Sequence, residues 1–364
     1  MSPDKKSGSP NQARQSPGLS PFAEAPEVTA LAPLHVVAIG GGTGLSTLLR
    51  GLRRHVSVPG QPAGSDALIA DLAAVVTVTD DGGSSGRLRK DFNMLPPGDL
   101  RNCMVALSEE EDLLSKLFAH RFRAGDALEG HNFGNLFVAA LTELTGDFAH
   151  AVQLASKILA TRGRIYPVTT ANATLVARMT DGSLVRGETS ITASKQVIAE
   201  LMLDPPDAAA TPETLDAIKR ADLISVGPGS LYTSLVTNLL VKGIPEALAA
   251  ARGTRVFICN LMSQANESLG LTASQHIERI YEHTGAPIFD YAIVNTGRFS
   301  DETLARYAAE HAQPIEADLE RIEQLGVRCI AGDFASEDSV VRHNANRVTG
   351  ALLTLGRAAA FRRT

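Results

Sequence analysis

A glycine-rich loop follows the first apolar run of the chain, and its composition suits phosphate binding. Residues 36–49 read VVAIGGGTGLSTLL. Glycine has no Cβ to keep phosphate oxygens away from backbone N–H groups, and the N-terminus of a following helix attracts negative charge. We therefore predict that this loop holds a phosphate-bearing ligand, with a simple turn as the alternative. The predicted contact residues are Gly40, Gly41, Gly42, Thr43 and Gly44.

The spacing of these glycines departs from the dinucleotide fingerprint. The pattern G-x-G-x-x-G needs its third glycine at a position that Leu45 occupies. That glycine normally allows the helix to pack closely on the strand. The loop therefore favours another nucleotide over NAD, and a nicotinamide-dependent dehydrogenase ranks behind the two hypotheses given below.

A second polar loop, DDGGSSGR at residues 80–87, follows the next apolar run. Two adjacent carboxylates can accept hydrogen bonds from ribose hydroxyls or hold Mg²⁺ beside substrate phosphates, whereas a solvated turn is the plainer interpretation. The glycines and serines could cradle an anion, and an arginine could bind phosphate through two hydrogen bonds. The predicted ligand residues are Asp80, Asp81, Ser84, Ser85 and Arg87, with Asp80 as the candidate Mg²⁺ ligand.

Polar and glycine residues also follow the later apolar runs. GPGSLYTS at residues 227–234 repeats the order of apolar run, glycines and helical pattern. Arg101 is expected in the first turn of a helix, where a cation opposes the helix dipole; anion binding would explain it, and a plain surface arginine is the alternative. No nucleophilic triad stands out, so no catalytic residue is predicted. The additional candidate ligand residues are Arg101, Asn135, Gly227, Gly229, Ser230, Asn260 and Asn295.

The elements that must position these loops are short apolar runs separated by helical patterns. Strands alternating with helices indicate a Rossmann-like, doubly wound α/β fold with a mostly parallel sheet. The carboxyl ends of such strands share one edge, which brings the polar loops together. The Asp181–Gly182 turn predicts a small β-hairpin insert at about 165–192. The expected strands are 36–39, 74–79, 223–226, 256–259, 291–294 and 327–331.

Length and composition are those of a globular chain. Its 364 residues are 44% hydrophobic, and the net charge of −6 gives no electrostatic footprint for nucleic acid. No apolar run reaches a membrane-spanning length, and no secretory pattern follows the early lysines, which predicts a cytoplasmic protein. Six of the eighteen prolines lie in 1–33, which predicts a disordered tail. A single domain at 34–347 and a C-terminal helix or tail at 348–364 complete the expected organisation.

Six motifs, taken in order, closely resemble those of one bacterial protein family. They are VVAIGGGTGLSTLLRGL, TVTDDGGSSGRLR, PPGDLRNCMVAL, GHNFGNLFVAALTELTGDF, ADLISVGPGSLYTSLVTNLLVKGI and NTG. Together they make residues 35–343 similar to the YvcK-type gluconeogenesis factors, which share a superfamily with CofD, the 2-phospho-L-lactate transferase of deazaflavin coenzyme biosynthesis. The resemblance implies ligand contacts at Gly41, Gly42, Thr43, Asp80, Arg101, Asn135, Gly227, Gly229, Ser230 and Asn260.

The resemblance also implies a function. Members of this family bind nucleotide sugars, notably UDP-N-acetylglucosamine, in the cytoplasm and support cell shape and envelope synthesis during gluconeogenic growth. The first hypothesis is therefore a nucleotide-sugar-binding regulator with an unidentified protein partner in envelope synthesis, and a homo-oligomer is compatible with it. The alternative is a Mg²⁺-dependent, CofD-like transferase that moves a phospho-lactyl-type group from a nucleotide-diphospho donor, with Asp80 and Asp81 holding the metal.

Overall fold

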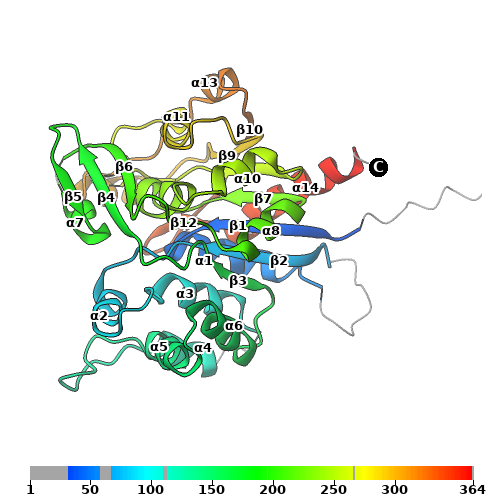
Figure 1. Cartoon of the computed structure of the whole chain (residues 1–364). Helices are drawn as coiled ribbons and strands as arrows, with labels where there is room; N and C mark the ends of the chain where they lie inside the picture. The colour runs from blue at the N-terminus through cyan, green and yellow to red at the C-terminus, as the bar shows by residue number, and fades with distance from the viewer. Residues whose placement is uncertain (1–31, 58–66, 110–112, 195, 265–266, 363–364) are drawn as a thin grey trace, which may run out of the picture. The chain divides into compact units, whose positions relative to one another are not determined.

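A seven-stranded, all-parallel β-sheet forms the centre of the fold (Figure 1). The structure is a computed structural model. It describes residues 32–57, 67–109, 113–194, 196–264 and 267–362, so that nearly all of the predicted tail at 1–33 lies outside the described residues. The predicted Rossmann-like α/β fold is confirmed. In spatial order the strands are β10 (Arg328–Gly332), β9 (Tyr291–Asn295), β8 (Thr254–Ile258), β7 (Leu223–Val226), β1 (Leu34–Gly40), β2 (Ile69–Val76) and β3 (Arg164–Pro167).

The central strands are continuous apolar runs because helices cover both faces of the sheet. Val36, Ala38 and Ile39 of β1 are each at most 1% exposed. The predicted strand at 74–79 is wrong at its end, since β2 stops at Val76. Its neighbours β1 and β3 both end opposite Val76, which leaves the following residues no ladder to extend. The polar loop at 80–87 therefore starts farther from the sheet than predicted.

The chain reverses its direction of travel across the sheet between β1 and β7. From β1 it crosses to β2, whereas from β7 it crosses to β8 on the other side. The two strands are direct neighbours, with Ile39 opposite Val226 at their carboxyl ends. In open α/β sheets such a topological switch point leaves a crevice between the two departing loops, where ligands bind.

Helices α1 and α14 pack together on one face of the sheet with α3. Leu45, Leu48, Leu49 and Leu52 of α1 recur at helical spacing and are at most 2% exposed. The segment predicted as a C-terminal helix or tail at 348–364 is part of α14, which starts earlier and buries its apolar side in the core. The helices between β1 and β3, together with α14, are α1 (Gly42–Arg53), α2 (Gly83–Phe92), α3 (Gly98–Leu107), α4 (Leu113–Ala119), α5 (Phe133–Thr145), α6 (Phe148–Ile158) and α14 (Ala345–Phe361).

The remaining helices connect the strands on the β7 side of the switch point. Among them is a short π-helix, η1, which begins directly after the glycine loop at residues 227–230. No helix among the described residues is both long and apolar enough to span a bilayer. These elements are α8 (Pro212–Arg220), η1 (Leu231–Val236), α9 (Thr237–Leu239), α10 (Ile244–Ala250), α11 (Ala273–Thr284), α12 (Asp301–Ala309) and α13 (Leu319–Gln324).

Two small antiparallel sheets stand outside the main one. The Asp181–Gly182 turn joins β4 (Thr174–Met179) to β5 (Leu184–Arg186), as the hairpin signal predicts, and β6 (Ile198–Asp204) adds a third strand. The insert therefore differs from the predicted span of 165–192, because β3 belongs to the main sheet and β6 lies beyond residue 192. Helix α7 (Glu188–Ala193) completes the insert. The second small sheet pairs β11 (Ala335–Glu337) with β12 (Val341–His343).

Candidate functional site

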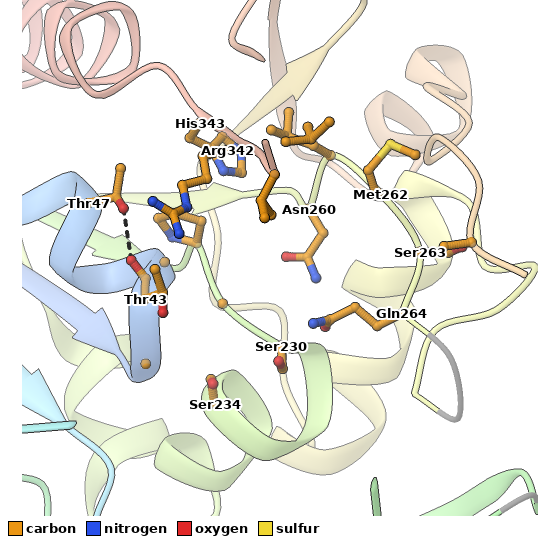
Figure 2. A pocket seen from close by; sticks show the side chains of 18 of the residues that line it. Thr43, Thr47, Ser230, Ser234, Asn260, Met262, Ser263, Gln264, Arg342 and His343 are labelled. Carbon is orange, nitrogen blue, oxygen red and sulfur yellow. Dashed lines mark hydrogen bonds between the residues drawn. The ribbon is translucent and has the colours of Figure 1, made fainter. Parts of the chain in front are cut away.

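A cavity of about 590 Å³ opens at the switch point (Figure 2). The loops after β1, β7 and β8 line it, and residues 307–312 and 340–343 complete its wall. This volume lies within the range of small-molecule sites. The predicted ligand residues that line the cavity are Gly41, Gly42, Thr43, Gly44, Gly229, Ser230 and Asn260.

The loop after β1 presents the start of helix α1 to this cavity. Its cap residue, Gly41, is extended and offers no side chain to the first turn of the helix. Gly42 adopts a φ of +61°, which few other residues tolerate. Thr47 donates to the Thr43 carbonyl at 2.9 Å and so keeps its hydroxyl beside the loop. The Gly42 N–H donates to the Asp99 carboxylate, and the positive end of the helix dipole suits an anion at the groups that follow.

The loop after β7 forms the adjoining wall and carries two serines. Ser230 and Ser234 both line the cavity, at the start and in the middle of the π-helical turn. Asn238 ties this turn to the first loop, because its Nδ2 donates to the Gly40 carbonyl at 3.0 Å. Gly40, the last residue of β1, and Gly227, the first residue after β7, do not line the cavity. Short π-helical segments are frequent at functional sites.

The start of η1 is not available to a ligand, because the protein fills it with its own carboxylate. Glu267 accepts hydrogen bonds from the Tyr232 N–H at 3.1 Å and from the Thr233 hydroxyl at 2.8 Å. Burial raises the pKa of Glu267, while these hydrogen bonds lower it. The GPGSLYTS segment therefore lines the cavity with Pro228, Gly229, Ser230 and Ser234.

Arg342 is one of the cavity residues that the sequence reasoning missed. It lies on β12 at the cavity wall, and Figure 2 shows its guanidinium extending toward the part of α1 that carries Thr43 and Thr47. Within the described part of the chain, this guanidinium has no hydrogen-bond or ion-pair partner. The strand beneath it is fixed: the Val341 N–H donates to the Tyr307 hydroxyl at 2.9 Å, and the His343 Nε2 lies 3.0 Å from the Cys259 carbonyl oxygen. An unpaired cation thus faces the start of α1 across the cavity, where the Asp99 carboxylate already accepts from the Gly42 N–H.

His343 holds β12 in place as a neutral group. Burial lowers its pKa to about 4, although the hydrogen bond with the Cys259 carbonyl opposes this shift. At neutral pH the Nε2–H of His343 therefore donates to that carbonyl. Of the neighbours Arg342 and His343, only Arg342 carries a positive charge. The position of the hairpin is coupled in this way to the end of β8.

The loop after β8 forms the wall opposite the glycines. Its Ser263 N–H donates to the Gln313 carbonyl at 2.7 Å, and Met262 pairs with Pro314. The amides of Asn260 and Gln264 point into the cavity in Figure 2. Each amide can both donate and accept hydrogen bonds, as recognition of a nucleobase or an acetamido group requires.

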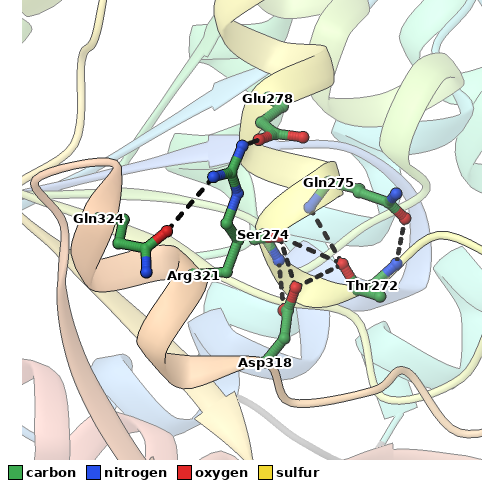
Figure 3. A network of polar contacts seen from close by, with 7 residues as sticks. All are labelled: Thr272, Ser274, Gln275, Glu278, Asp318, Arg321 and Gln324. Atoms are coloured by element: carbon green, nitrogen blue, oxygen red, sulfur yellow. Dashed lines mark hydrogen bonds and ion pairs between the residues drawn. The ribbon is translucent and has the colours of Figure 1, made fainter.

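A polar network anchors helix α11 beyond this wall (Figure 3). The Asp318 carboxylate accepts from the Ser274 N–H at 2.8 Å and from the Thr272 hydroxyl at 2.7 Å. Thr272 and Gln275 form a capping box at the start of α11. Arg321 of α13 donates to Glu278 of α11 at 2.9 Å. The network joins α11 to α13.

Three carboxylates from separate elements cluster beside the first glycine loop, outside the cavity. Burial raises the pKa of Asp99 to about 6 and that of Glu188 to about 9, and repulsion from Asp80 adds to both shifts. A Cβ on Gly41 would lie 2.8 Å from Asp99 Oδ2, which shows how closely the cluster adjoins the loop. Asp81 is engaged elsewhere, since it accepts from the Thr189 N–H at 2.8 Å.

The carboxylates of this cluster include Asp80, the predicted Mg²⁺ ligand. Among the residues that the structure describes, no three carboxylate, histidine or cysteine side chains are placed to hold a metal ion. Mg²⁺ needs fewer protein ligands when substrate phosphates and waters supply the rest. Asp80 can supply one, although its Oδ1 already accepts from the Gly82 N–H at 2.9 Å. Magnesium at Asp80 stays a prediction.

The other predicted residues of the 80–87 loop bind protein groups. The Ser84 hydroxyl lies 3.1 Å from His131 Nδ1, and Asn135 Nδ2 donates to Ser85 at 3.5 Å. Arg87 donates to the Glu129 carbonyl, and Arg101 donates to Asn135 Oδ1 at 3.3 Å.

Residues 82–86 have the spacing G-x-S-x-G of a hydrolase nucleophile, which the sequence reasoning overlooked. Ser84 and His131 are both buried and lie outside the cavity, so this pair joins α2 to the start of α5.

Asn295 is also placed away from the cavity. Its Oδ1 accepts from the Phe334 N–H at 2.8 Å, and its Nδ2 donates to the Gly297 carbonyl at 3.1 Å. These bonds join the end of β9 to the residues that follow β9 and β10. Asn295 thus shares the carboxyl edge of the sheet with the predicted site without reaching the switch point.

Comparison with known proteins identifies the family. The model for 2-phospho-L-lactate transferase CofD matches residues 36–335. The gluconeogenesis factors of Halalkalibacterium halodurans and Bacillus subtilis are 46% and 43% identical over 320 and 321 residues, which cover 88% of this chain and 95% and 97% of theirs. The chain belongs to the CofD family, as a gluconeogenesis factor. A crystal structure of a upf0052 family member from Bacillus halodurans has a TM-score of 0.82 at 45% identity and covers 88% of this chain and 99% of its own.

The family match covers the glycine loops of this CofD-family chain and stops before β12. Its last matched residue, 335, opens the β11–β12 hairpin that carries Arg342. The gluconeogenesis factors match 88% of the chain. The match to the family model does not include Arg342. Its place at the site is known from the geometry of the cavity.

Proposed function

We propose that this gluconeogenesis factor binds a nucleotide sugar, UDP-N-acetylglucosamine, in the cavity at the switch point. The observation that carries the proposal is the guanidinium of Arg342, which has no protein partner among the described residues and lies opposite the start of α1 at Gly41–Gly44. A diphosphate between them would receive backbone N–H bonds on one side and charge-assisted bonds on the other. The cavity volume of about 590 Å³ suits a ligand of this size.

The other walls supply groups for the sugar and the base. Ser230 and Ser234 offer hydroxyls beside the phosphate position, whereas Asn260 and Gln264 offer amides on the opposite wall. His343, a cavity residue that could move a proton, is neutral and bonded to the Cys259 carbonyl. We therefore propose a cytoplasmic sensor that binds without turnover and regulates cell shape and envelope synthesis during gluconeogenic growth.

Thermal unfolding of the purified full chain tests the proposal. The ligands are UDP-N-acetylglucosamine, UDP-glucose, GDP and NAD, each with and without Mg²⁺. A ligand at about a hundredfold excess over Kd should stabilise the fold by about 2.7 kcal/mol. Arg342→Ala should abolish most of this shift for UDP-sugars, because charge-assisted hydrogen bonds contribute roughly 1.5–3 kcal/mol each. Arg357→Ala, on the exposed side of α14, is the matched control and should leave the shift unchanged.

Two outcomes would overturn the proposal. One is an equal UDP-sugar shift in wild type and Arg342→Ala, which would place the ligand elsewhere. The other is stabilisation by NAD alone, which would restore the dehydrogenase hypothesis.

A Mg²⁺-dependent, CofD-like transferase is the second candidate, and the carboxylate cluster at Asp80 favours it. The repulsion among Asp80, Asp99 and Glu188 would be relieved by a bound cation. A thermal shift that appears only with GDP and Mg²⁺, and that Asp80→Asn removes, would favour this candidate. Release of a transferred group from a nucleotide-diphospho donor would then exclude a sensor without turnover.

A further inference from the structure

The end of helix α12 brings a second pair of polar side chains to the cavity at the switch point. Tyr307 and Glu310, the C-cap residue of α12, both line this cavity, and their spacing of one helical turn makes them neighbours on the helix surface. We propose that they bind adjacent hydroxyl groups of a neutral hexose, so that this end of α12 is the sugar subsite. The inference rests on the proposed function and names the class of sugar that the site accepts.

Both side chains have unused hydrogen-bonding capacity. The Tyr307 hydroxyl accepts from the Val341 N–H at 2.9 Å, and its own O–H has no acceptor among the residues that the structure describes. The Glu310 carboxylate has neither a hydrogen-bond nor an ion-pair partner within the same part of the chain. A sugar hydroxyl both donates and accepts, and a phenol beside an ionised carboxylate supplies the matching acceptor and donor.

The charges of the cavity lie on two separate residues. Its lining side chains include one guanidinium, Arg342, and one carboxylate, Glu310, and these two form no ion pair. Arg342 extends toward the start of α1, where the diphosphate is proposed to bind (Figure 2). The carboxylate is therefore left for a part of the ligand that has hydroxyl donors and no negative charge.

The other charged groups near Glu310 do not remove this preference. Glu310 lies at the C-terminus of α12, where the helix dipole is negative. The Arg306 guanidinium lies 5.6 Å from the centre of the Tyr307 ring, but it donates to the Asp338 carbonyl and does not line the cavity. His311 is also absent from the lining. A second anionic group on the ligand would thus be repelled at this position.

The position of Glu310 favours contact with the sugar over contact with the base. The segment that follows it is bonded to the loop after β8, since the Ser263 N–H donates to the Gln313 carbonyl at 2.7 Å and the Gln313 N–H donates to Ser263 Oγ at 2.9 Å. Glu310 therefore adjoins the wall opposite the glycines. Two neighbouring hexose hydroxyls offer two donors to a carboxylate, whereas the pairing edge of uracil places its one N–H between two carbonyl oxygens.

The test compares UDP-N-acetylglucosamine with UDP by isothermal titration calorimetry on the full chain. Glu310→Gln should weaken the UDP-sugar by at least about fivefold, because charge-assisted hydrogen bonds become neutral ones. The Kd for UDP should change by less than about twofold. Glu302→Gln makes the same change in charge at an exposed position in the first turn of α12 and should alter neither Kd.

Tyr307→Phe should also lower the ratio of the UDP Kd to the UDP-sugar Kd. Losing the bond to Val341 can displace Arg342, but this affects the diphosphate of both ligands and cancels in the ratio. A charged sugar gives an independent readout. Wild type should bind UDP-glucose at least about fivefold more tightly than UDP-glucuronate, and Glu310→Gln should bring the two within about twofold.

Three results would overturn this inference and leave the proposed function standing. Equal weakening of UDP and the UDP-sugar by Glu310→Gln would place the ribose at the carboxylate. Weakening of GDP alone would assign the carboxylate to a guanine edge, which also offers two donors. Unchanged affinity for every ligand would exclude a contact with Glu310. Failure of wild type to bind any UDP-sugar would instead overturn the proposed function and this inference together.

Discussion

Gly44 of α1 lies against the carbonyl group of Pro228. A Cβ on Gly44 would stand 2.5 Å from the Pro228 oxygen and 3.1 Å from the Gly229 nitrogen. Two of the loops that line the cavity at the switch point are therefore in backbone contact, and only glycine permits this approach. The contact sets the separation of the Gly41–Gly44 backbone from Ser230.

Replacing Gly44 by alanine should push the two loops apart. We expect Gly44→Ala to lower the free energy of unfolding by about 1–3 kcal/mol, as overpacking does. UDP-sugar affinity should fall by at least about tenfold, which corresponds to roughly 1.4 kcal/mol. Urea unfolding and isothermal titration calorimetry measure the two effects. Gly350→Ala in α14 is the control, because nothing lies within 4 Å of its added Cβ; unchanged affinity in Gly44→Ala would contradict the prediction.

Glu267 should matter for stability and not for ligand binding. Glu267→Ala leaves the Tyr232 N–H without its acceptor, which should cost about 1–3 kcal/mol of unfolding free energy. Affinity for the UDP-sugar should stay within about twofold, because neither residue lines the cavity and independent sites behave additively. Glu267→Gln retains an acceptor oxygen and should recover most of the stability. An affinity loss as large as that of Arg342→Ala would mean that the ligand reaches the start of η1.

Glu188 should make the protein less stable as the pH rises. Burial and then repulsion from Asp80 and Asp99 raise its pKa to about 9. The unfolded value is about 4.3, so between these pH values the folded chain keeps a proton that the unfolded chain releases. The free energy of unfolding therefore falls by about 1.4 kcal/mol per pH unit from this group.

The substitution Glu188→Gln keeps a neutral side chain of the same shape and removes this slope. Urea unfolding at a series of pH values should give similar stabilities for wild type and variant at pH 4. The variant should become increasingly more stable toward pH 8. Glu213→Gln, at an exposed position, should leave the slope of the wild type unchanged. Parallel curves for wild type and Glu188→Gln would rule the prediction out.

Asp318 should hold the α11–α13 pair together. Burial alone would raise the pKa of Asp318, but hydrogen bonds from Ser274 and Thr272 lower it below its ordinary value. Its contribution is therefore full at neutral pH and is lost as the pH falls through the lowered pKa. Asp318→Ala should reduce the unfolding free energy by about 2 kcal/mol at neutral pH. Glu320→Gln on the same helix is the control, and an equal loss in both variants would argue against the network in Figure 3.

The strands and the glycine loops could be predicted from the sequence because their signals are local. The expected strand at 223–226 coincides with β7, since a short and mostly apolar run between a helical pattern and glycines is typical of a strand covered on both faces. The strand order is not a local property. The loop at 80–87 follows β2, whereas the cavity opens between β1 and β7, so Asp80 and the glycines of the first loop share an edge of the sheet without sharing a wall.

Arg342 could not be found by the same reasoning. It stands in VVRHN, which has neither glycines nor a motif with known chemistry. It reaches the cavity only because β12 folds back across the start of α1, and a contact between residues so far apart in sequence leaves no trace in periodicity. Tyr307 and His343, whose hydrogen bonds hold the β11–β12 hairpin, could not be predicted from the sequence for the same reason.

The place of Arg342 after the last strand of the sheet has a consequence for synthesis. A chain that has emerged from the ribosome through β10 already contains all seven strands and both glycine loops, yet it lacks the cation that faces them. Chains fold from the N-terminus as they are made. If the cavity binds the proposed nucleotide sugar, a nascent sheet lacks the Arg342 contact while it assembles, and capture of the ligand at full affinity should begin only once β12 has emerged.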